Sequence, residues 1–309
     1  MDKKLKEILD RAKTLPEFWQ MDVDTARQTY LDRCVKSSLA EKIEKTKDIV
    51  IKKKNHQIKI RVYFPKVKKK ESLSGLIFFH GGGFVIGSVE THDHLCRRLS
   101  RLSNSVIFSV EYRLAPEFKF PAAIFDSTDA VKWIFDNTKK FNVNKNKIGI
   151  AGDSAGACIA AVISILFRKH KFICFNYQIL IYPCTAPKPN NKSHFTFAKG
   201  FLLSRKNILW FYDNYKDSSL DEKDFRYAPI ISQDLSELPK SLIVVAGYDP
   251  LRDEGIKYAE KLIHFGNDVQ LINYKDMVHG FFLMTKLQDS RNAINKTVSF
   301  IKESTQYLY

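Results

Sequence analysis

The chain has 309 residues, of which 44% are hydrophobic and 27% charged, which is typical of a globular protein and excludes a disordered one. Its 50 basic and 34 acidic side chains give a formal net charge of +16, which raises nucleic acid, anionic membranes or acidic ligands as partners. The sequence lacks a long apolar run, a secretory signal and metal-binding cysteine spacing, which predicts a reduced, cytoplasmic protein with no integral membrane segment.

The first 45 residues are expected to be helical. Apolar side chains at helical spacing fall on one face of a first helix: Leu5, Ile8, Leu9 and Ala12. Pro16 interrupts this pattern before a second helix expected at about 24–43. From about residue 46 the period changes to two, which predicts a hairpin of strands at 48–53 and 57–64.

Short apolar runs and helix-like segments alternate through the rest of the chain. The runs are 76–79, 106–110, 148–151, 177–181, 242–246 and 269–274. The helix-like segments are roughly 91–103, 121–137, 154–169, 252–265 and 286–304. Runs that are apolar on both faces are typical of buried parallel strands, so the alternation predicts a doubly wound α/β sheet with helices on both faces. Region 184–228 interrupts the rhythm and is expected to be an insertion over the carboxyl edge of the sheet.

A turn between an expected strand and an expected helix carries a candidate nucleophile. Gly152-Asp-Ser-Ala-Gly156 matches the pattern G-x-S-x-G, in which a serine lies on a sharp strand-to-helix turn. Such a turn requires small neighbours, and Gly152, Ala155 and Gly156 meet that requirement. Ser154 would then lie at the head of a helix, whose amides favour developing negative charge. A passive serine in a glycine-rich turn is the alternative.

A glycine-rich segment, His80-Gly-Gly-Gly-Phe84, follows the expected strand 76–79. Its glycines would let backbone N–H groups approach a substrate oxygen closely. Together with the Ala155 amide, the amides of Gly81 and Gly82 are candidates for an oxyanion hole. A flexible loop or a phosphate-binding loop is the alternative, although the sequence lacks the G-K-[ST] and G-x-G-x-x-G patterns of nucleotide sites.

A serine nucleophile needs a base, and the base needs an acid that orients it. His279 and Asp249 each follow an expected strand, so both are predicted to emerge at the sheet edge where Ser154 emerges. The rival candidates are the acids Asp253 and Asp276 and the histidine His80.

Six segments together resemble the hormone-sensitive-lipase-like branch of the α/β-hydrolases, which includes bacterial carboxylesterases and arylacetamide deacetylase. They are His80–Phe84, Glu111–Glu117, Phe120–Ala123, Gly152–Gly156, Ala246–Gly255 and His279–Phe281. The resemblance implies an α/β-hydrolase fold, a mostly parallel central sheet flanked by helices, with a helical cap. It also implies Ser154 as nucleophile, Asp249 as orienting acid and His279 as base, which is the chain order typical of that fold. The implied oxyanion donors are the amides of Gly81, Gly82 and Ala155.

The resemblance also implies how the chain is divided. The catalytic core would comprise residues 46–184 and 229–309, and the cap would comprise residues 1–45 and 185–228. The candidates for the walls of an apolar pocket are Phe84, Tyr182, Phe201, Leu202 and Trp210, with Phe18 and Trp19 as weaker candidates. Each of these side chains could equally pack within the cap or the core.

These observations predict a serine carboxylesterase that hydrolyses small to medium acyl esters through an acyl-enzyme intermediate, with no metal or other cofactor. An arylester or amide deacetylase of the same family is the nearest alternative. A non-catalytic ligand receptor on the same scaffold is a third, which the presence of His279 beside Ser154 and Asp249 disfavours.

The positive charge is interpreted as a solvated surface. The densest basic runs, Lys52–Lys54 and Lys66–Lys70, lie at or beside expected turns without a helix-turn-helix, zinc-finger or RNP motif. We therefore expect a small-molecule ester substrate and no nucleic-acid partner, and homo-oligomerisation is left open.

Overall fold

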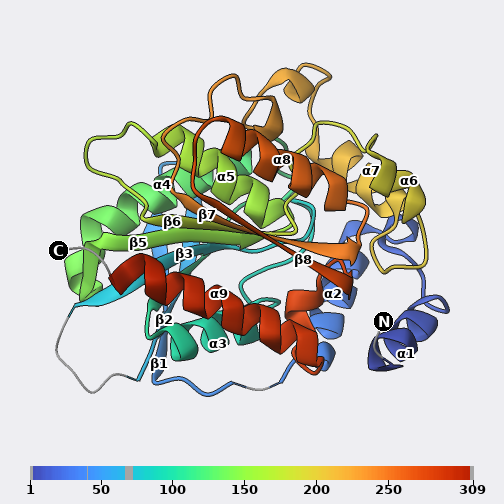
Figure 1. Ribbon diagram of the computed structural model, residues 1–309, viewed down its shortest axis with the longest axis horizontal. Coiled ribbons are helices and arrows are strands. Elements are labelled where there is room, and N and C mark those ends of the chain that lie inside the picture. Colours follow the sequence, from blue (N-terminus) through green and yellow to red (C-terminus); the bar gives the residue numbers. More distant parts are fainter. Residues whose placement is uncertain (1–2, 40, 67–71, 307–309) are drawn as a thin grey trace.

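Figure 1 shows the computed structural model, which describes residues 3–39, 41–66 and 72–306. Residues 67–70 of the basic run noted above therefore lie outside the described residues. An eight-stranded sheet with the strand order β1-β2-β4-β3-β5-β6-β7-β8 forms the centre of the fold. Its strands are β1 (Lys45–Lys52), β2 (Gln57–Phe64), β3 (Leu73–Phe79), β4 (Val106–Glu111), β5 (Val143–Asp153), β6 (Tyr177–Ile181), β7 (Lys240–Tyr248) and β8 (Val269–Val278).

The sheet is mostly parallel, as the alternation of apolar runs and helical segments predicts. Strands β3 to β8 pair in parallel, whereas β2 pairs antiparallel with both β1 and β4. The predicted hairpin is therefore the antiparallel extension of a parallel sheet. Because the parallel strands point the same way, β3, β5, β7 and β8 deliver the residues that follow them to one edge.

Helices cover both faces of the sheet. The helices are α1 (Lys3–Ala12), α2 (Val23–Ser37), α3 (Asp93–Ser103), α4 (Ala122–Asn137), α5 (Ala155–Phe167), α6 (Lys192–Thr196), α7 (Arg205–Tyr215), α8 (Arg252–His264) and α9 (Gln288–Gln306). Short 3-10 helices are η1 (Phe18–Gln20), η2 (Thr138–Phe141), η3 (Asp221–Lys223), η4 (Pro229–Ile231) and η5 (Phe281–Leu283). Helices α3 and α9 lie on one face, and α4, α5 and α8 lie on the other (Figure 1).

The two faces of the sheet bury separate apolar clusters, because side chains alternate along a strand. In β3, Ile77 and Phe79 belong to the cluster beneath α4 and α5, whereas Leu76 and Phe78 belong to the cluster beneath α3 and α9. Strand β8 does not follow this pattern: each of its residues from 269 to 274 is partly or fully exposed. The prediction that this run is buried on both faces is wrong, because β8 is the last strand at the edge of the sheet.

The second helix also ends earlier than predicted. Helix α2 ends at Ser37 rather than near residue 43, because Ser38 adopts an extended backbone with φ −100° and ψ 159°. The chain leaves the helix there and reaches β1 at Lys45.

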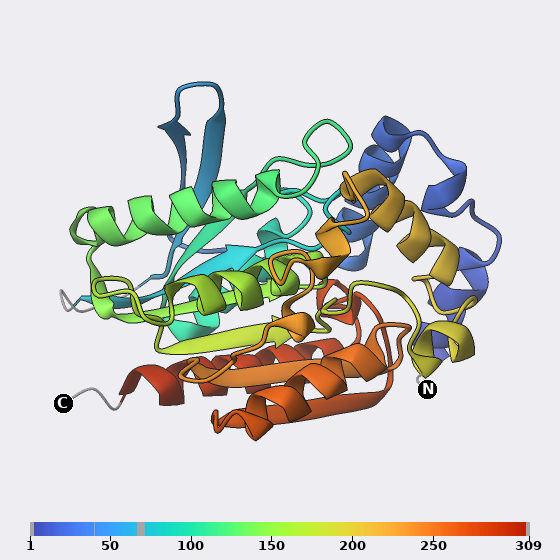
Figure 2. The ribbon, with the colours of Figure 1, turned by 90° about the horizontal axis from the view of Figure 1, so that it is seen from above.

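Helices from two distant parts of the chain lie together over the carboxyl edge of the sheet (Figure 2). We call α1, η1, α2, α6 and α7 the helical layer. Its two parts are joined by hydrogen bonds: the Ser204 hydroxyl donates to the Glu17 carboxylate, and the Trp19 amide donates to Asn207 Oδ1 at 3.2 Å. Arg27 of α2 ties the layer to the loop after β3 by donating to the carbonyl of Val85 at 3.0 Å.

Within the described ranges, none of the helices combines the length and the apolar character needed to cross a membrane.

Helix α5 packs unusually close to β3. A Cβ added at Gly156 would lie 2.0 Å from the carbonyl oxygen of Phe79, and one added at Gly152 would lie 2.2 Å from the Gly156 carbonyl oxygen. Only glycine allows this approach, which holds the start of the helix against the strand that precedes the glycine-rich segment.

We therefore expect Gly156→Ala to lower the free energy of unfolding by about 1–3 kcal/mol, measured by urea denaturation, because the added methyl overpacks the contact with Phe79. Helix propensity alone has the opposite sign, since alanine is favoured over glycine within a helix by about 0.5–1 kcal/mol. Gly266→Asn is a suitable control, because a Cβ at Gly266 meets nothing within 4 Å and asparagine tolerates its positive φ. An unchanged or increased stability of Gly156→Ala would contradict the close packing.

Candidate active site

Ser154 lies on the sharp turn between β5 and α5, as predicted. Its backbone has φ 54° and ψ −119°, a conformation that costs a non-glycine residue roughly 1–3 kcal/mol. The Ser154 amide donates to the carbonyl of Ile181 at 2.9 Å, and the Ser154 carbonyl accepts from the amides of Ala157 and Cys158. The surrounding hydrogen bonds thus hold the strained turn, and the side chain is presented at the head of α5.

The structure brings the three predicted residues Ser154, His279 and Asp249 into one chain of hydrogen bonds. Ser154 Oγ lies 3.0 Å from His279 Nε2, and His279 Nδ1 lies 2.8 Å from Asp249 Oδ2. Asp249 is fully buried, and its other oxygen, Oδ1, accepts from the Leu251 amide at 2.8 Å. Both carboxylate oxygens are therefore bonded, so the acid is held in the orientation that faces the imidazole.

The rival acid Asp253 and the rival histidine His80 lie in other networks. Asp253, the second residue of α8, accepts from the Ser193 amide at 2.8 Å. His80 is fully buried, and its Nδ1 lies 2.9 Å from the Gly81 carbonyl oxygen. Among the described residues, neither is hydrogen-bonded to the Ser154 side chain, which pairs with His279 instead.

The glycine-rich segment differs from its predicted role at one position. The Gly81 amide donates to Asp153 Oδ1 at 2.8 Å, and Gly81 is not among the residues that line the cavity at Ser154. The prediction that Gly81 supplies an oxyanion donor is therefore wrong, because a buried carboxylate already accepts from this N–H. Gly82 and Gly83 do line the cavity beside Ser154.

Three amides remain free to face a substrate oxygen. Within the part of the chain that the structure describes, those of Gly82, Gly83 and Ala155 have no hydrogen-bond acceptor. Gly82 has φ 127° and Gly83 has φ 60°, which are conformations that favour glycine. A Cβ at Gly82 would also lie 2.0 Å from the Ile86 carbonyl oxygen, so the loop is tightly folded.

Asp153 is a functional residue that sequence reasoning missed. Its carboxylate is buried, lies 2.9 Å from His92 Nε2 and accepts from the Tyr182 hydroxyl at 3.4 Å. Burial by itself raises the pKa of Asp153, but His92 and the Gly81 amide outweigh burial and lower the pKa below its ordinary value. The only sequence signal for this residue is its place immediately before Ser154.

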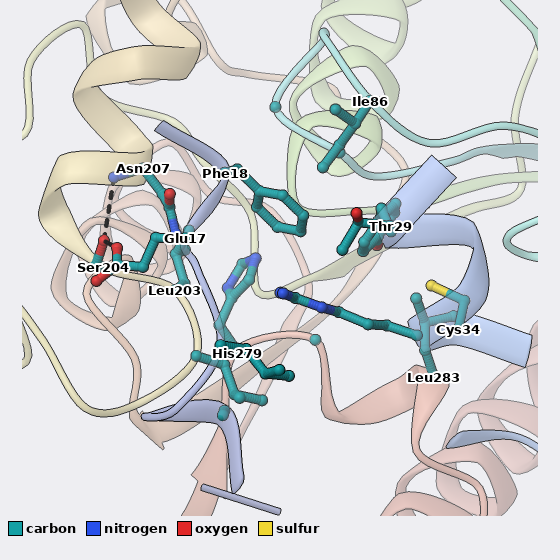
Figure 3. Close-up of a pocket in the computed structure, with 18 of the residues that line it drawn as sticks. Glu17, Phe18, Thr29, Cys34, Ile86, Leu203, Ser204, Asn207, His279 and Leu283 are labelled. Carbon is teal, nitrogen blue, oxygen red and sulfur yellow. Dashed lines mark hydrogen bonds between the residues drawn. The ribbon is translucent and has the colours of Figure 1, made fainter. Parts of the chain in front are cut away.

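The candidate site opens into a cavity of about 1370 Å³ beneath the helical layer (Figure 3). Of the five predicted pocket residues, Phe84 and Leu202 line it. Tyr182, Phe201 and Trp210 are not among the lining residues, and those three predictions are wrong. Tyr182 is buried beneath the His279 ring at a centroid distance of 4.6 Å, and Phe201 stacks on Tyr248 at 5.2 Å.

The orientation of α7 explains why Trp210 does not line the cavity and why its neighbour Phe211 does. Asn207, Ile208 and Phe211 face the cavity, whereas Trp210 packs its ring against the side of Phe211. Of the two weaker candidates, Phe18 lines the cavity and Trp19 does not. Figure 3 shows Phe18 among the residues that line the cavity with His279 and with Thr29 of α2.

The structure gives no sign of a metal centre among the residues it describes, since no group of three or more His, Cys, Asp or Glu side chains there could hold an ion. The arrangement of a bonded serine, imidazole and carboxylate beside free amides is instead suited to acyl transfer, in which a nucleophile, a base and oxyanion donors converge on one carbonyl.

Comparisons with known proteins agree with this geometry. A family model described as the alpha/beta hydrolase fold matches residues 76–283. An arylesterase of Saccharolobus solfataricus is 35% identical over 269 residues, which cover 86% of this chain and 86% of that protein. An ethyl acetate hydrolase of Pseudomonas putida is 32% identical over 232 residues, 74% of this chain and 73% of that protein. The solved structure of a hyperthermophilic esterase from Pyrobaculum calidifontis has a TM-score of 0.91 and 39% identity, covering 98% of both chains.

The buried His80 makes the stability of the site dependent on pH. Burial, together with a smaller effect of the neighbouring His92, lowers the pKa of His80 to about 3. Its Nε2 has no hydrogen-bond partner, so a proton there would leave a buried N–H unpaired. Because the pKa in the unfolded chain is about 6.5, the contribution of His80 is present above pH 6.5 and is lost as pH falls toward 3.

We expect the unfolding free energy of the wild type to fall by about 1 kcal/mol per pH unit more steeply than that of His80→Asn between pH 6.5 and 4. The asparagine amide can replace the Nδ1 donor to Gly81 but takes up no proton. Urea titrations at each pH measure the difference, and the buried His94 is present in both proteins, so its own protonation cancels. Parallel pH profiles for the two proteins would refute the assignment.

Proposed function

This chain belongs to the α/β-hydrolase family, in its hormone-sensitive-lipase-like carboxylesterase branch, and we propose that it hydrolyses small to medium acyl esters through an acyl-enzyme formed on Ser154. That it is a carboxylic ester hydrolase follows from its relatives, which include an arylesterase and an ethyl acetate hydrolase. The observation that carries the proposal is the hydrogen-bonded chain from Ser154 Oγ through His279 to Asp249.

In the first step, Ser154 Oγ attacks the ester carbonyl carbon while His279 Nε2 takes the hydroxyl proton. The 3.0 Å separation of these atoms supports direct transfer. Asp249 accepts from Nδ1–H, which keeps Nε2 free of a proton before attack and stabilises the imidazolium after it.

The carbonyl oxygen becomes negatively charged as the tetrahedral intermediate forms. We propose that the amides of Gly82, Gly83 and Ala155 stabilise it, in place of the set that included Gly81. Each donor of this kind is worth roughly 3–4 kcal/mol in the transition state. The Ala155 amide adds the favourable end of the α5 dipole.

The intermediate then collapses. The bond to the alcohol oxygen breaks, and His279 returns its proton to that oxygen, which leaves the acyl group on Ser154 as an ester. Water repeats the sequence: His279 removes a water proton, the hydroxide attacks the acyl carbon, and Ser154 Oγ leaves with the proton. The acid and alcohol are the products, and no group outside this chain is consumed except water.

We also propose that residues 1–45 and 185–228 act as a cap on a core of residues 46–184 and 229–309. The bonds between Ser204 and Glu17 and between Trp19 and Asn207 support a single layer built from both cap segments. This layer covers the cavity and restricts water at the reacting carbonyl.

The preference for small to medium acyl groups is supported by the wall opposite the glycine-rich segment. A Cβ at Gly83 would lie 2.3 Å from the Phe211 ring, so this ring stands directly against the proposed oxyanion loop. Phe84, at the end of the glycine-rich segment, stacks on Tyr215 of α7 at a centroid distance of 3.9 Å, which holds this segment against α7.

We expect Ser154→Ala to lower kcat for p-nitrophenyl acetate, butyrate and octanoate by roughly 10⁴- to 10⁶-fold, because the nucleophile and its imidazole act as a unit. Release of p-nitrophenolate measures the rate. Ser164→Ala is the matched control, since Ser164 lies in the same helix and its hydroxyl donates to the carbonyl of Ala160 in that helix. Activity that survives Ser154→Ala would overturn the mechanism, and activity confined to long-chain esters such as the palmitate would overturn the substrate size.

A further inference from the structure

An arginine of α2 lines the proposed substrate cavity. The face of α2 that borders the cavity includes Thr29, Tyr30, Arg33, Cys34 and Ser37, at helical spacing. Labelled side chains in Figure 3 show this face: Thr29 and Cys34 lie across the cavity from His279. The Arg33 guanidinium carbon is 5.0 Å from the centroid of the Phe18 ring, and both residues line the same cavity as Ser154 and His279. A cation therefore lines the cavity that holds the reacting groups.

This guanidinium has few partners. Arg33 Nη2 donates to the carbonyl of Pro16 at 3.1 Å, and an arginine carries five N–H donors. Among the described residues, no carboxylate lies within 4.0 Å of Arg33. Burial lowers the pKa of the guanidinium below its ordinary value, because water is removed from the charge without an acid to replace it. Arginine nevertheless stays protonated in proteins, so the charge persists.

The carboxylates that line the cavity are already bonded elsewhere. Glu17 accepts from the Ser204 hydroxyl, Asp22 accepts from the Thr25 amide at 2.8 Å, and Asp32 accepts from Gln28 Nε2 at 3.0 Å. Asp153, which also lines the cavity, pairs with His92 as described above. The remaining lining cations are the exposed side chains of Arg11, Lys13, Lys36, Lys199 and Lys286. Arg33 is thus a half-buried cation in a cavity with an excess of positive charge.

We propose that Arg33 binds an oxyanion of the substrate, so that the preferred esters carry a second, ionised acidic group remote from the ester bond. The planar guanidinium fits a carboxylate with two parallel hydrogen bonds, which favours half-esters of dicarboxylic acids over phosphorylated esters. The apolar stem of such a substrate would lie against Phe18, between the anion and the carbonyl. This inference rests on the proposed function, because it names the substrate class of the same site.

The test compares two esters of equal length. p-Nitrophenyl valerate is neutral, and mono-p-nitrophenyl glutarate replaces its terminal methyl with a carboxylate. We expect Arg33→Met to lower kcat/KM for the glutarate by about 10- to 100-fold, mainly through KM, and to change that for the valerate less than about twofold. Arg33→Lys should retain part of the preference, because it keeps the charge and loses the planar fork. A third substrate separates carboxylate from phosphate-like recognition: a p-nitrophenyl carboxylic ester of the same length whose remote carboxylate is replaced by a phosphonate group. An equal dependence of its kcat/KM on Arg33 would overturn the preference for dicarboxylic half-esters.

Arg205→Met is the matched control. Arg205 also stacks on an aromatic ring, that of Phe195 at 4.8 Å, but it lies outside the cavity lining. We expect its substitution to leave the glutarate-to-valerate ratio of kcat/KM unchanged.

Three results would overturn the inference. The first is an unchanged ratio in Arg33→Met. The second is an equal loss for both esters in Arg33→Met, which would make Arg33 only a support for Pro16 and Phe18. The third is an equal fall in the ratio for Arg205→Met, which would reflect net charge alone. If valerate hydrolysis needs Ser154 and any of these three results is found, the inference fails and the proposed function stands. If valerate hydrolysis survives Ser154→Ala, the proposed function itself is refuted.

Discussion

The bond from the Gly81 amide to the buried Asp153 carboxylate links the two halves of the site, and the rest of the arrangement depends on it. Asp153 precedes Ser154 at the end of β5, and Gly81 begins the glycine-rich segment after β3. The 2.8 Å bond therefore sets the loop that carries the free amides relative to the nucleophile. An uncompensated carboxylate would be costly in this interior, and His92 supplies the compensation at 2.9 Å. The buried Asp153 carboxylate, with its contacts to Gly81 and His92, thus stabilises the geometry of a site whose reacting groups lie on other residues.

The parallel strands explain why a few contacts are sufficient to position the residues of the site. Strands β3, β5, β7 and β8 end at one edge, and the residues that follow them are the glycine-rich loop, the serine, the acid and the histidine. The close approach of Gly156 to the Phe79 carbonyl then keeps α5 against β3, so that the Ala155 amide and the loop amides face the same side. The helical layer closes this edge and contributes the walls of the cavity, including the cation Arg33.

The sequence predicted the parts of the site that strand ends determine. Ser154, Asp249 and His279 each follow an apolar run, so their meeting could be expected without side-chain detail. Which of the three adjacent glycine amides are left free as oxyanion donors could not be predicted. The answer depends on which N–H donates to the Asp153 carboxylate, and the sequence assigned that carboxylate no role. The sequence also could not predict that β8 is an edge strand, since an apolar run does not show whether a further strand pairs with it.

Side-chain direction accounts for the other errors. Trp210 and Phe211 are both aromatic neighbours in a helical segment, and only the phase of α7 against the cavity separates them. Tyr182 and Phe201 pack against His279 and Tyr248 rather than facing the cavity. Arg33 was missed for the same reason: in a surface helix, a basic residue is expected to face water.

The central claim is that acyl transfer proceeds through a covalent bond to Ser154, and trapping that bond tests it most directly. Incubation with diethyl p-nitrophenyl phosphate, followed by intact-mass and peptide mass spectrometry, should show one diethylphosphoryl group per chain on the peptide that contains Ser154. Esterase activity should be lost in proportion to that labelling, and His279→Gln should label far more slowly. Loss of activity without modification of Ser154, or stoichiometric labelling of another residue, would contradict the account.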